Sequence, residues 1–458
     1  MQLWLSSITN RANPHPQYDA KNANIARNSP RAPFRGHTQK ILYPFGLRIQ
    51  NRLQSKIQIP KSKIFRHGYH PHPMSNLSYR TAGESHGPAL TVLVEGLPAD
   101  LPLPLELINH ELTRRQGGYG RGGRQKIEKD AVTISAGVRH GLTTGAPLVM
   151  QIVNRDSRLE DAPPITRPRP GHADFAGAMK WLTTDCRNTL ERASARETAG
   201  RVAAGALSKA LLAEFGIKSV GFVSSIGAVA ARVAESLTPG EIVTQRDAND
   251  LYTPDAAAVE PMTNAIFEAK KAGDTLGGIV EVRVFGVPPG LGTCIAWQDK
   301  LDGRLMQALG SIQAFKGVEI GLGFAATRLP GSQVHDAIHY DASASQTSNL
   351  GFTRPTNRAG GIEGGMTNGQ TIVVRGAMKP ISTLLQGMDS VDLATRQPER
   401  SAYERSDICA VPAASVIAEN VVAFEIARAL CEKFAGDTLR ELRNAYDFYI
   451  ASNQGNSQ

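Results

Sequence analysis

The sequence predicts an α+β fold in which the strands are largely antiparallel. Strand-like segments alternate with glycine-rich turns and a few strong helices, and there is no regular strand–helix–strand alternation of the kind that builds a parallel sheet. We find no internal repeat. Of the 458 residues 41% are hydrophobic, so the chain can bury a core of one large domain or two ordinary ones.

In chain order, the segment ALTVLVEGLP (residues 89–98) is typical of a strand. Residues 104–115 predict a helix with Leu105, Ile108 and Leu112 on one face. Later elements are a strand over residues 130–138, a helix over 302–315 that leads into a strand over 317–324, and a long apolar helix over 413–434.

The clearest helix is predicted over residues 194–216. Ser194 and Glu197 have the spacing of a capping box at its start, and Gly216 is placed to end it. Small residues along its length permit close packing against neighbouring elements.

The positive net charge of the chain belongs to its first segment. Residues 1–73 hold 12 of the 51 Lys and Arg but one of the 42 Asp and Glu, so residues 74–458 carry 39 basic against 41 acidic side chains. A nearly neutral body disfavours a nucleic-acid-binding protein that would work through the basic segment, and we expect no nucleic-acid partner.

Residues 1–73 are rich in Arg, poor in acids and without periodicity, so we expect a disordered extension. Its apolar start, MQLWL, is too short for a secretory signal. An organellar transit peptide has the same charge pattern. We favour an upstream start codon, with Met74 as the functional beginning, because folded-looking sequence starts within a few residues of it. A cytoplasmic location follows, with organellar import as the alternative.

Neither a membrane span nor a disulfide framework is expected. No run approaches the roughly 18 apolar residues that a span needs. The four cysteines are scattered without C-x-x-C spacing, which indicates a reducing compartment and argues against a zinc site. We therefore expect no metal and no membrane partner.

The stretch GESHG, residues 83–87, fits the G-x-S-x-G pattern of a serine hydrolase with Ser85 as nucleophile. That elbow needs a buried strand before it and a helix directly after it. Here the preceding segment is mostly polar and a strand-like segment follows. The expected triad order also fails, because the last histidine is His339. The hydrolase is the disfavoured alternative.

The stretch GYGRGG, residues 118–123, formally matches a dinucleotide fingerprint. A fingerprint must follow a strand and open a helix, whereas this one follows a helix and leads into a strand. What remains is a glycine loop flanked by Arg114, Arg115, Arg121, Arg124 and Lys126. It is either a solvated basic loop or a loop whose amides and arginines bind an anion.

The same combination of glycines and basic residues recurs elsewhere in the chain, at Arg187, Arg192, Arg196, residues 359–369, Lys379 and Arg405 with Asp407. Each could be a cap, a turn or a surface ion pair. Together they predict a highly anionic small-molecule ligand in a site built from distant segments. His86 and His172 lie in glycine-flanked turns beside such segments and are candidates for proton chemistry.

Eight ordered blocks resemble the chorismate synthase family over about residues 79–430. They read GESHGPALTVLVEGLP, RPGHAD, ERASARETAGRVAAGA, GVPPGLG, SIQAFKGVEIGLGF, NRAGGIEGGMTNG, MKPIS and RSDICAVPAASVIAE. The resemblance implies a β-α-β sandwich for a single catalytic domain over residues 74–458, and a homotetramer. It also implies a lyase that converts 5-enolpyruvylshikimate 3-phosphate to chorismate by 1,4-elimination with reduced FMN, in aromatic amino acid biosynthesis.

The resemblance also assigns roles to residues. His86 would lie near the reduced flavin, His172 would act as the acid toward the departing phosphate, and Asp407 would assist proton removal through the flavin. Arg115 and Arg121 fall at positions for substrate or NADP. The FMN positions are Arg192, Ala193, Ser194, Gln313, Ala314, Gly364, Lys379, Pro380, Ile381, Ser382, Thr383 and Arg405.

Two motifs depart from the family pattern. Residues 114–118 read RRQGG where the family has Arg-Arg-Arg-Pro-Gly, and residues 407–409 read DIC where it has Asp-Pro-Cys. NADPH is a possible source of the reducing equivalents in a bifunctional enzyme. No added reductase domain is evident, so we favour a monofunctional enzyme that depends on a separate flavin reductase.

Overall fold

We describe the computed structural model of the chain over residues 77–123, 128–401 and 406–454. These residues all belong to one compact unit, His70–Gln458. The predicted extension over residues 1–73 and the predicted FMN position Arg405 lie outside the described residues.

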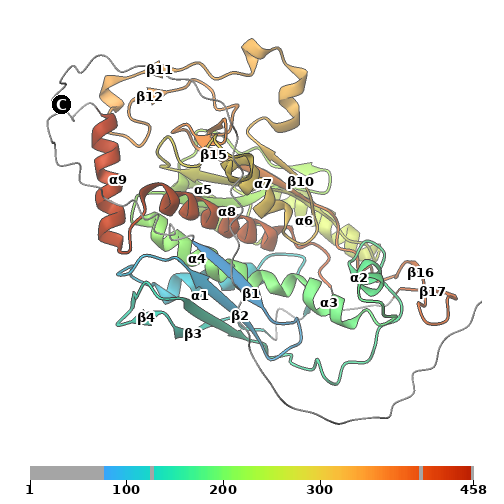
Figure 1. Ribbon diagram of the computed structural model, residues 1–458. Coiled ribbons are helices and arrows are strands. Elements are labelled where there is room, and N and C mark those ends of the chain that lie inside the picture. The colour runs from blue at the N-terminus through green and yellow to red at the C-terminus, as the bar shows by residue number, and fades with distance from the viewer. Residues whose placement is uncertain (1–76, 124–127, 402–405, 455–458) are drawn as a thin grey trace, which may run out of the picture. The chain divides into compact units, whose positions relative to one another are not determined.

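Two antiparallel sheets enclose a layer of helices (Figure 1). The first sheet has the order β1-β2-β6-β3, with strands Ser78–Ala82, Ala89–Glu95, Leu148–Val153 and Val132–Ala136. The second has the order β10-β15-β9-β7-β8, with strands Phe315–Ile320, Ile372–Met378, Gly278–Phe285, Lys218–Ile226 and Val229–Ala230. Every ladder within these two sheets is antiparallel, so the predicted fold class is confirmed.

The helices between the sheets are α4, Thr198–Ala213, and α8, Val411–Phe434, with α1, Leu105–Gln116, packed against both (Figure 1). The remaining helices are α2 Asp174–Lys180, α3 Arg187–Ala193, α5 Pro239–Asp247, α6 Ala256–Lys271, α7 Leu301–Gly310 and α9 Leu439–Asn453.

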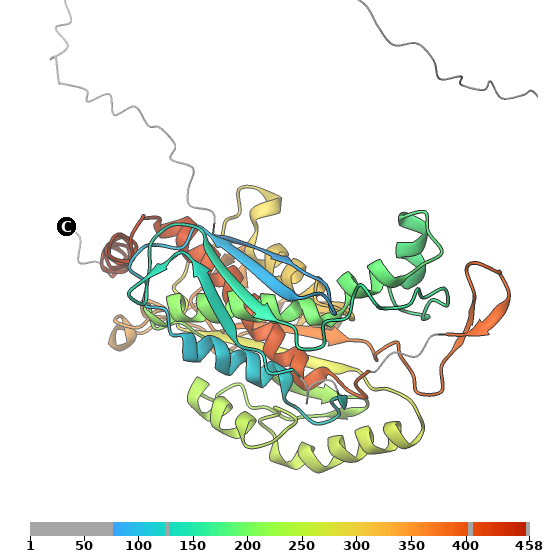
Figure 2. The ribbon, with the colours of Figure 1, turned by 90° about the horizontal axis from the view of Figure 1, so that it is seen from below.

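Outside the two large sheets, the described residues form four short two-stranded hairpins. They are β4–β5 (Val138–Arg139, Leu142–Thr143), β11–β12 (His339–Tyr340, Phe352–Thr353), β13–β14 (Ile362–Glu363, Met366–Thr367) and β16–β17 (Asp389–Val391, Pro398–Arg400). The β16–β17 hairpin lies beside the segment that carries α2 and α3 (Figure 2).

The helix α8 is apolar on all sides because it is enclosed by α4 and the second sheet. Of its 24 residues, 20 are buried. Two glycines allow the close approach of its neighbours: a Cβ atom at Gly205 of α4 would lie 2.3 Å from the Asn420 carbonyl oxygen, and one at Gly221 of β7 would lie 2.5 Å from that of Ser415. Larger residues at either position would push these elements apart.

The predicted capping box at Ser194 and Glu197 is wrong. Ser194 caps a 3₁₀ turn, Ala195–Glu197, and its hydroxyl accepts from the Arg196 amide, while α4 begins only at Thr198. The Glu197 carboxylate instead binds Thr81 and Arg201. The contacts of Glu197 with distant Thr81 and with Arg201 therefore replace the capping contact that the Ser194–Glu197 spacing predicts.

Two further expectations are corrected. The polar segment before GESHG forms strand β1, since its polar side chains are only half-buried at the sheet edge while its backbone pairs with β2. Leu105, expected on the buried face of α1, is 37% exposed because it opens the helix, whereas Ile108 and Leu112 are fully buried.

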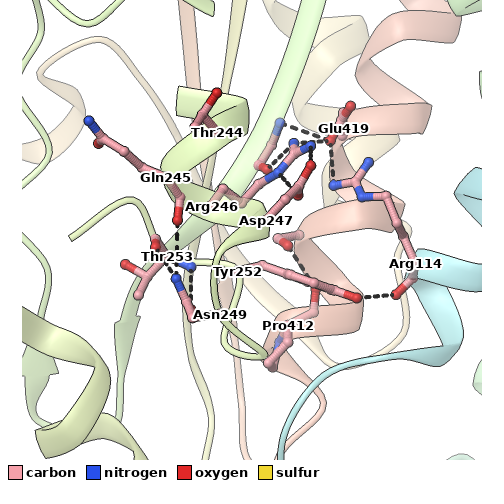
Figure 3. A network of polar contacts seen from close by, with 12 residues as sticks. Arg114, Thr244, Gln245, Arg246, Asp247, Asn249, Tyr252, Thr253, Pro412 and Glu419 are labelled. Atoms are coloured by element: carbon pink, nitrogen blue, oxygen red, sulfur yellow. Dashed lines mark hydrogen bonds and ion pairs between the residues drawn. The ribbon is translucent and has the colours of Figure 1, made fainter. Parts of the chain in front are cut away.

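A buried carboxylate, Glu419, stands near the middle of α8 and binds groups from four other elements. Figure 3 shows it with Arg114 and Arg246. It accepts from Arg114 of α1 at 3.2 Å, Arg246 of α5 at 3.0 Å and the Gly221 amide of β7 at 3.1 Å, and it also pairs with Lys209 of α4. Burial alone would raise its pKa, but these three cations hold the pKa well below the usual carboxyl range.

Replacing Glu419 by Gln should lower the free energy of unfolding by about 3–5 kcal/mol, because buried cations would lose the charge that compensates them. Urea unfolding measures the loss. Glu425→Gln on the same helix is the matched control: its carboxylate also contacts an arginine, Arg304, at 3.0 Å, but its side chain is 15% exposed against 2% for Glu419. It should cost about 1 kcal/mol. Equal losses for the two variants would contradict the role given to Glu419.

Candidate active site

A cavity of about 1080 Å³ opens at the amino-terminal end of α8. Segments far apart in the chain line it: the β1–β2 turn, the glycine loop after α1, the segment before α2, the α3–α4 junction, the start of β10 and residues 378–383. The amides at the start of a helix favour negative charge, so the position suits an anionic ligand.

Most of the predicted site residues line this cavity. They are His86, Arg115, Arg121, His172, Ala193, Ser194, Gln313, Ala314, Lys379, Ile381, Ser382, Thr383 and Asp407. Arg192, Gly364 and Pro380 are not among the lining residues. The Arg192 guanidinium donates to the carbonyl oxygens of Thr81 at 2.9 Å and Gly83 at 3.0 Å, and Gly364 lies in the turn between β13 and β14.

His86 and Ser85 lie in the turn between β1 and β2. Ser85 is buried, and its hydroxyl accepts a hydrogen bond from Ser194 at 3.1 Å. The His86 ring nitrogen Nδ1 contacts the Glu191 carboxylate at 2.9 Å. The turn runs directly into β2, as the sequence predicts, so a hydrolase nucleophile elbow is not formed even though a strand precedes it.

His172 is held by a buried acid and a buried arginine. Its Nδ1 contacts the carboxylate of Asp174, which is fully buried, and Arg169 binds the same carboxylate at 2.8 Å. Burial would raise the pKa of Asp174, but the hydrogen bonds from His172 and Arg169 hold that pKa well below its usual range. The acid is therefore ionised, and its carboxylate can accept a hydrogen bond from His172 Nδ1.

Residues 378–383 are tied to the His172 loop. Lys379 Nζ donates to the Gly171 carbonyl at 2.7 Å, and Arg169 donates to Thr383 Oγ1 at 3.2 Å. Burial, together with nearby Lys316, lowers the pKa of Lys379. A lysine with a lowered pKa beside a second lysine favours a negative ligand between them.

Asp407 closes the glycine loop onto the start of α8. It pairs with Arg121 at 2.6 Å and accepts from the Gly122 amide at 2.6 Å. The carbonyl of Gly120 accepts in turn from the Ile408 amide at 2.9 Å. The loop that resembles a dinucleotide fingerprint thus positions a carboxylate at the cavity.

Arg115 lies buried under the cavity wall. It donates to Thr198 Oγ1 at 2.9 Å and to the Ala195 carbonyl at 2.8 Å, and it lies 3.5 Å from Asp130. Burial lowers its pKa to about 10, which Asp130 only partly offsets. Arg196 binds the same Asp130 at 2.7 Å. The guanidinium groups of Arg115 and Arg196 are therefore both paired with protein groups.

The predicted group of three arginines does not stand free at the start of α4. Arg187 contacts Glu191 at 3.3 Å, Arg196 is committed to Asp130, and Arg192 donates to backbone carbonyls. Each of these three guanidinium groups therefore has a protein partner, and the binding of an anion beside them stays a prediction.

Sequence reasoning missed the acids that hold the histidines and arginines, above all Asp174, Glu191 and Asp130. Asp174 could have been found, because it lies two residues after His172. The partner of Glu191 lies 105 residues away, and the sequence gives no signal for that pairing.

The chain matches the family model described as Chorismate synthase over residues 77–431. It is 54% identical over 379 residues to the chorismate synthase of Desulforamulus reducens, an alignment that covers 80% of this chain and 96% of the relative. The chain belongs to the chorismate synthase family. It is also 54% identical to the chorismate synthase of Geobacter sulfurreducens, with 82% of this chain and 98% of the relative covered.

The fold agrees with this family. A solved structure titled "Crystal Structure of Chorismate Synthase" aligns with a TM-score of 0.69 and 42% identity, covering 83% of this chain and 99% of that chain. A lyase of the chorismate synthase family is thus confirmed over the serine hydrolase alternative. No helix among the described residues is long and apolar enough to cross a membrane.

Ser85 should not be a covalent nucleophile. Ser85→Ala should leave turnover measurable, because a hydroxyl hydrogen bond such as the one with Ser194 is worth about 0.5–1.5 kcal/mol. A fluorophosphonate should not label the wild-type protein, as intact mass spectrometry would show. Stoichiometric labelling of Ser85 with parallel loss of activity would restore the hydrolase interpretation.

Proposed function

We propose that this protein catalyses the chorismate synthase reaction, the 1,4-elimination of phosphate and a ring proton from 5-enolpyruvylshikimate 3-phosphate. The observation that carries the proposal is the convergence of His86, His172 and Asp407 on one cavity in a chain that matches the family along most of its length. The substrate carries a phosphate and two carboxylates, which suits a cavity with Lys316 and Lys379 on its wall.

The finer proposal is that the cavity binds reduced FMN. Its volume of about 1080 Å³ is at the upper end of ordinary ligand sites, so it has room for two ligands together. Gln313 lines it and has a buried amide oxygen, Oε1, without a hydrogen-bond partner among the described residues. Such an acceptor suits a ring N–H of a flavin.

The residues that would hold FMN are those predicted from the family motifs and found on the cavity wall: Ala193, Ser194, Gln313, Ala314, Lys379, Ile381, Ser382 and Thr383. Arg192, Gly364, Pro380 and Arg405 stay predictions. A reduced flavin supplies electron density to the carbon–oxygen bond that breaks.

The chain's own groups handle protons and charge. His172, whose Nδ1 contacts the Asp174 carboxylate, is placed to donate a proton to the departing phosphate. His86 holds a proton at the opposite turn, and the Asp407 carboxylate is placed to assist loss of the ring proton. Arg121, paired with Asp407, is the guanidinium that an anionic substrate would contact beside it.

We further propose a monofunctional, cytoplasmic homotetramer that receives its reduced flavin from a separate reductase. In support, residues 118–123 follow α1 and lead into β3, which is not the context of a dinucleotide-binding loop. Exposed apolar side chains such as Trp181, Leu182, Ile295 and Trp297 support contact with other copies of the chain.

Under anaerobic conditions, chemically reduced FMN should support chorismate formation while oxidised FMN should not. The reason is that the proposed elimination needs an electron-rich flavin yet consumes no net electrons. Chorismate is measured by its absorbance, with and without NADPH, and the flavin spectrum should be unchanged after many turnovers. Product formed at equal rate with oxidised flavin would exclude the proposed cofactor.

His86→Ala and His172→Ala should each lower kcat by about 10²–10⁴-fold, the usual contribution of one positioned proton-transfer group. FMN binding, followed by flavin fluorescence, should persist in both variants. His110→Ala is the matched control, since His110 lies on the exposed face of α1 away from the cavity lining. Unchanged kcat in the two cavity variants would remove the histidines from the mechanism.

A further inference from the structure

Glu191 of α3 fixes the backbone of the turn that carries His86. Its side chain is 1% exposed, and its Oε2 accepts from the His86 amide at 2.9 Å. Its own carbonyl oxygen accepts from the Ser85 amide at 3.1 Å. Two consecutive amides of the turn are thus bound to one residue of a helix, so the turn and α3 hold a common position.

The same carboxylate determines which ring nitrogen of His86 carries a proton. Nδ1 lies 3.0 Å from Oε1 and 2.9 Å from Oε2 of Glu191. An ionised carboxylate only accepts hydrogen bonds, so Nδ1 must be the donor. Nε2 is then left for the cavity side, where it lies 3.7 Å from Asp156 Oδ2, and both His86 and Asp156 line the cavity.

Within residues 77–123, 128–401 and 406–454, the acids that contact the His86 ring come from two segments, α3 and the segment after β6. The Glu191 carboxylate also forms an ion pair with Arg187 of the same helix at 3.3 Å. Asp156, in the segment after β6, forms an ion pair with Arg158 at 3.1 Å. Burial would raise the pKa of Glu191, but the hydrogen bonds and the charge of His86 hold that pKa below its usual range. Glu191 is thus ionised at neutral pH and faces the ring.

On the basis of the proposed function, in which His86 holds a proton at the cavity, we propose that Glu191 is the positioning residue of His86. It keeps Nδ1 protonated and directs Nε2 to the cavity. Glu191 touches no reacting atom in this proposal, so its effect on turnover passes through His86.

Carbethoxylation by diethyl pyrocarbonate tests the contact without turnover, because the reagent reacts only with an unprotonated ring nitrogen. The extent of modification at His86 is followed against pH by peptide mass spectrometry on the full chain. In Glu191→Gln the midpoint of the profile should fall by about one pH unit, since a neighbouring negative charge that favours the protonated ring is lost. His172 in the same digest is the internal control, and its midpoint should not move.

Two further variants complete this test. Glu281→Gln removes another buried carboxylate, which pairs with Arg283 at 2.7 Å outside the cavity lining, and should leave the His86 midpoint unchanged. Arg187→Gln should raise the midpoint, because it removes a positive charge that competes for Glu191. This opposite shift keeps the proposal testable if Glu191→Gln does not fold. A His86 profile that coincides with that of the wild type in Glu191→Gln or in Arg187→Gln would overturn the proposal.

A double-mutant cycle separates positioning from general damage. Glu191→Gln should lower kcat about 10–10²-fold in the wild-type background with little change in KM, and should have no further effect in the His86→Ala background. Additive losses in both backgrounds would show that Glu191 acts independently of His86. If the wild-type protein makes no chorismate, the proposed function is wrong. The pH profiles of His86 modification would still show whether Glu191 controls the His86 ring.

Discussion

The charge of Glu419 has to be compensated inside the protein, and this requirement fixes the helical layer on which the cavity is built. The helix α8 is enclosed on all sides, so an ionised carboxylate near its centre is stable only with cations from its neighbours. Arg114, Lys209 and Arg246 come from three different helices. Arg114 is followed in α1 by Arg115, which lines the cavity. Helix α1 therefore contributes one residue to the ion-pair network of Glu419 and the next residue to the cavity wall.

The same arrangement recurs at the cavity, where buried acids hold basic side chains in place: Asp130 binds Arg196, Asp174 binds His172 and Glu191 binds His86. Folding lowers the pKa of Asp174 and Glu191. The stability that these two acids contribute is therefore complete above the ordinary carboxyl range, and it is lost as the pH falls toward their folded-state values. In acid, the protein should therefore lose both stability and the positions of His86 and His172 in the cavity.

Much of this architecture could be predicted from local patterns. The helices α1, α4 and α8 and the turn that runs into β2 are properties of short segments, and they were predicted correctly, although Leu105 of α1 is exposed. The capping box at Ser194 failed because Thr81 and Arg201 attract Glu197, and the Glu191–His86 pair was invisible because its partners are 105 residues apart. Family motifs located the cavity wall, whereas the acids behind it could be found only in three dimensions.

The distribution of charge in the cavity indicates where an anionic ligand would bind. Arg115 and Arg169 line the cavity and are paired with Asp130 and Asp174, which hold the two arginines in the wall. Lys316 and Lys379, in contrast, have no ion pair with an acid among the described residues, and burial together with their mutual repulsion lowers the pKa of Lys379. An anion placed between them would relieve that repulsion and favour the charged form of Lys379. The two lysines would therefore add to the attraction that Arg121 is proposed to provide, while Asp130 and Asp174 hold Arg115 and Arg169 in place.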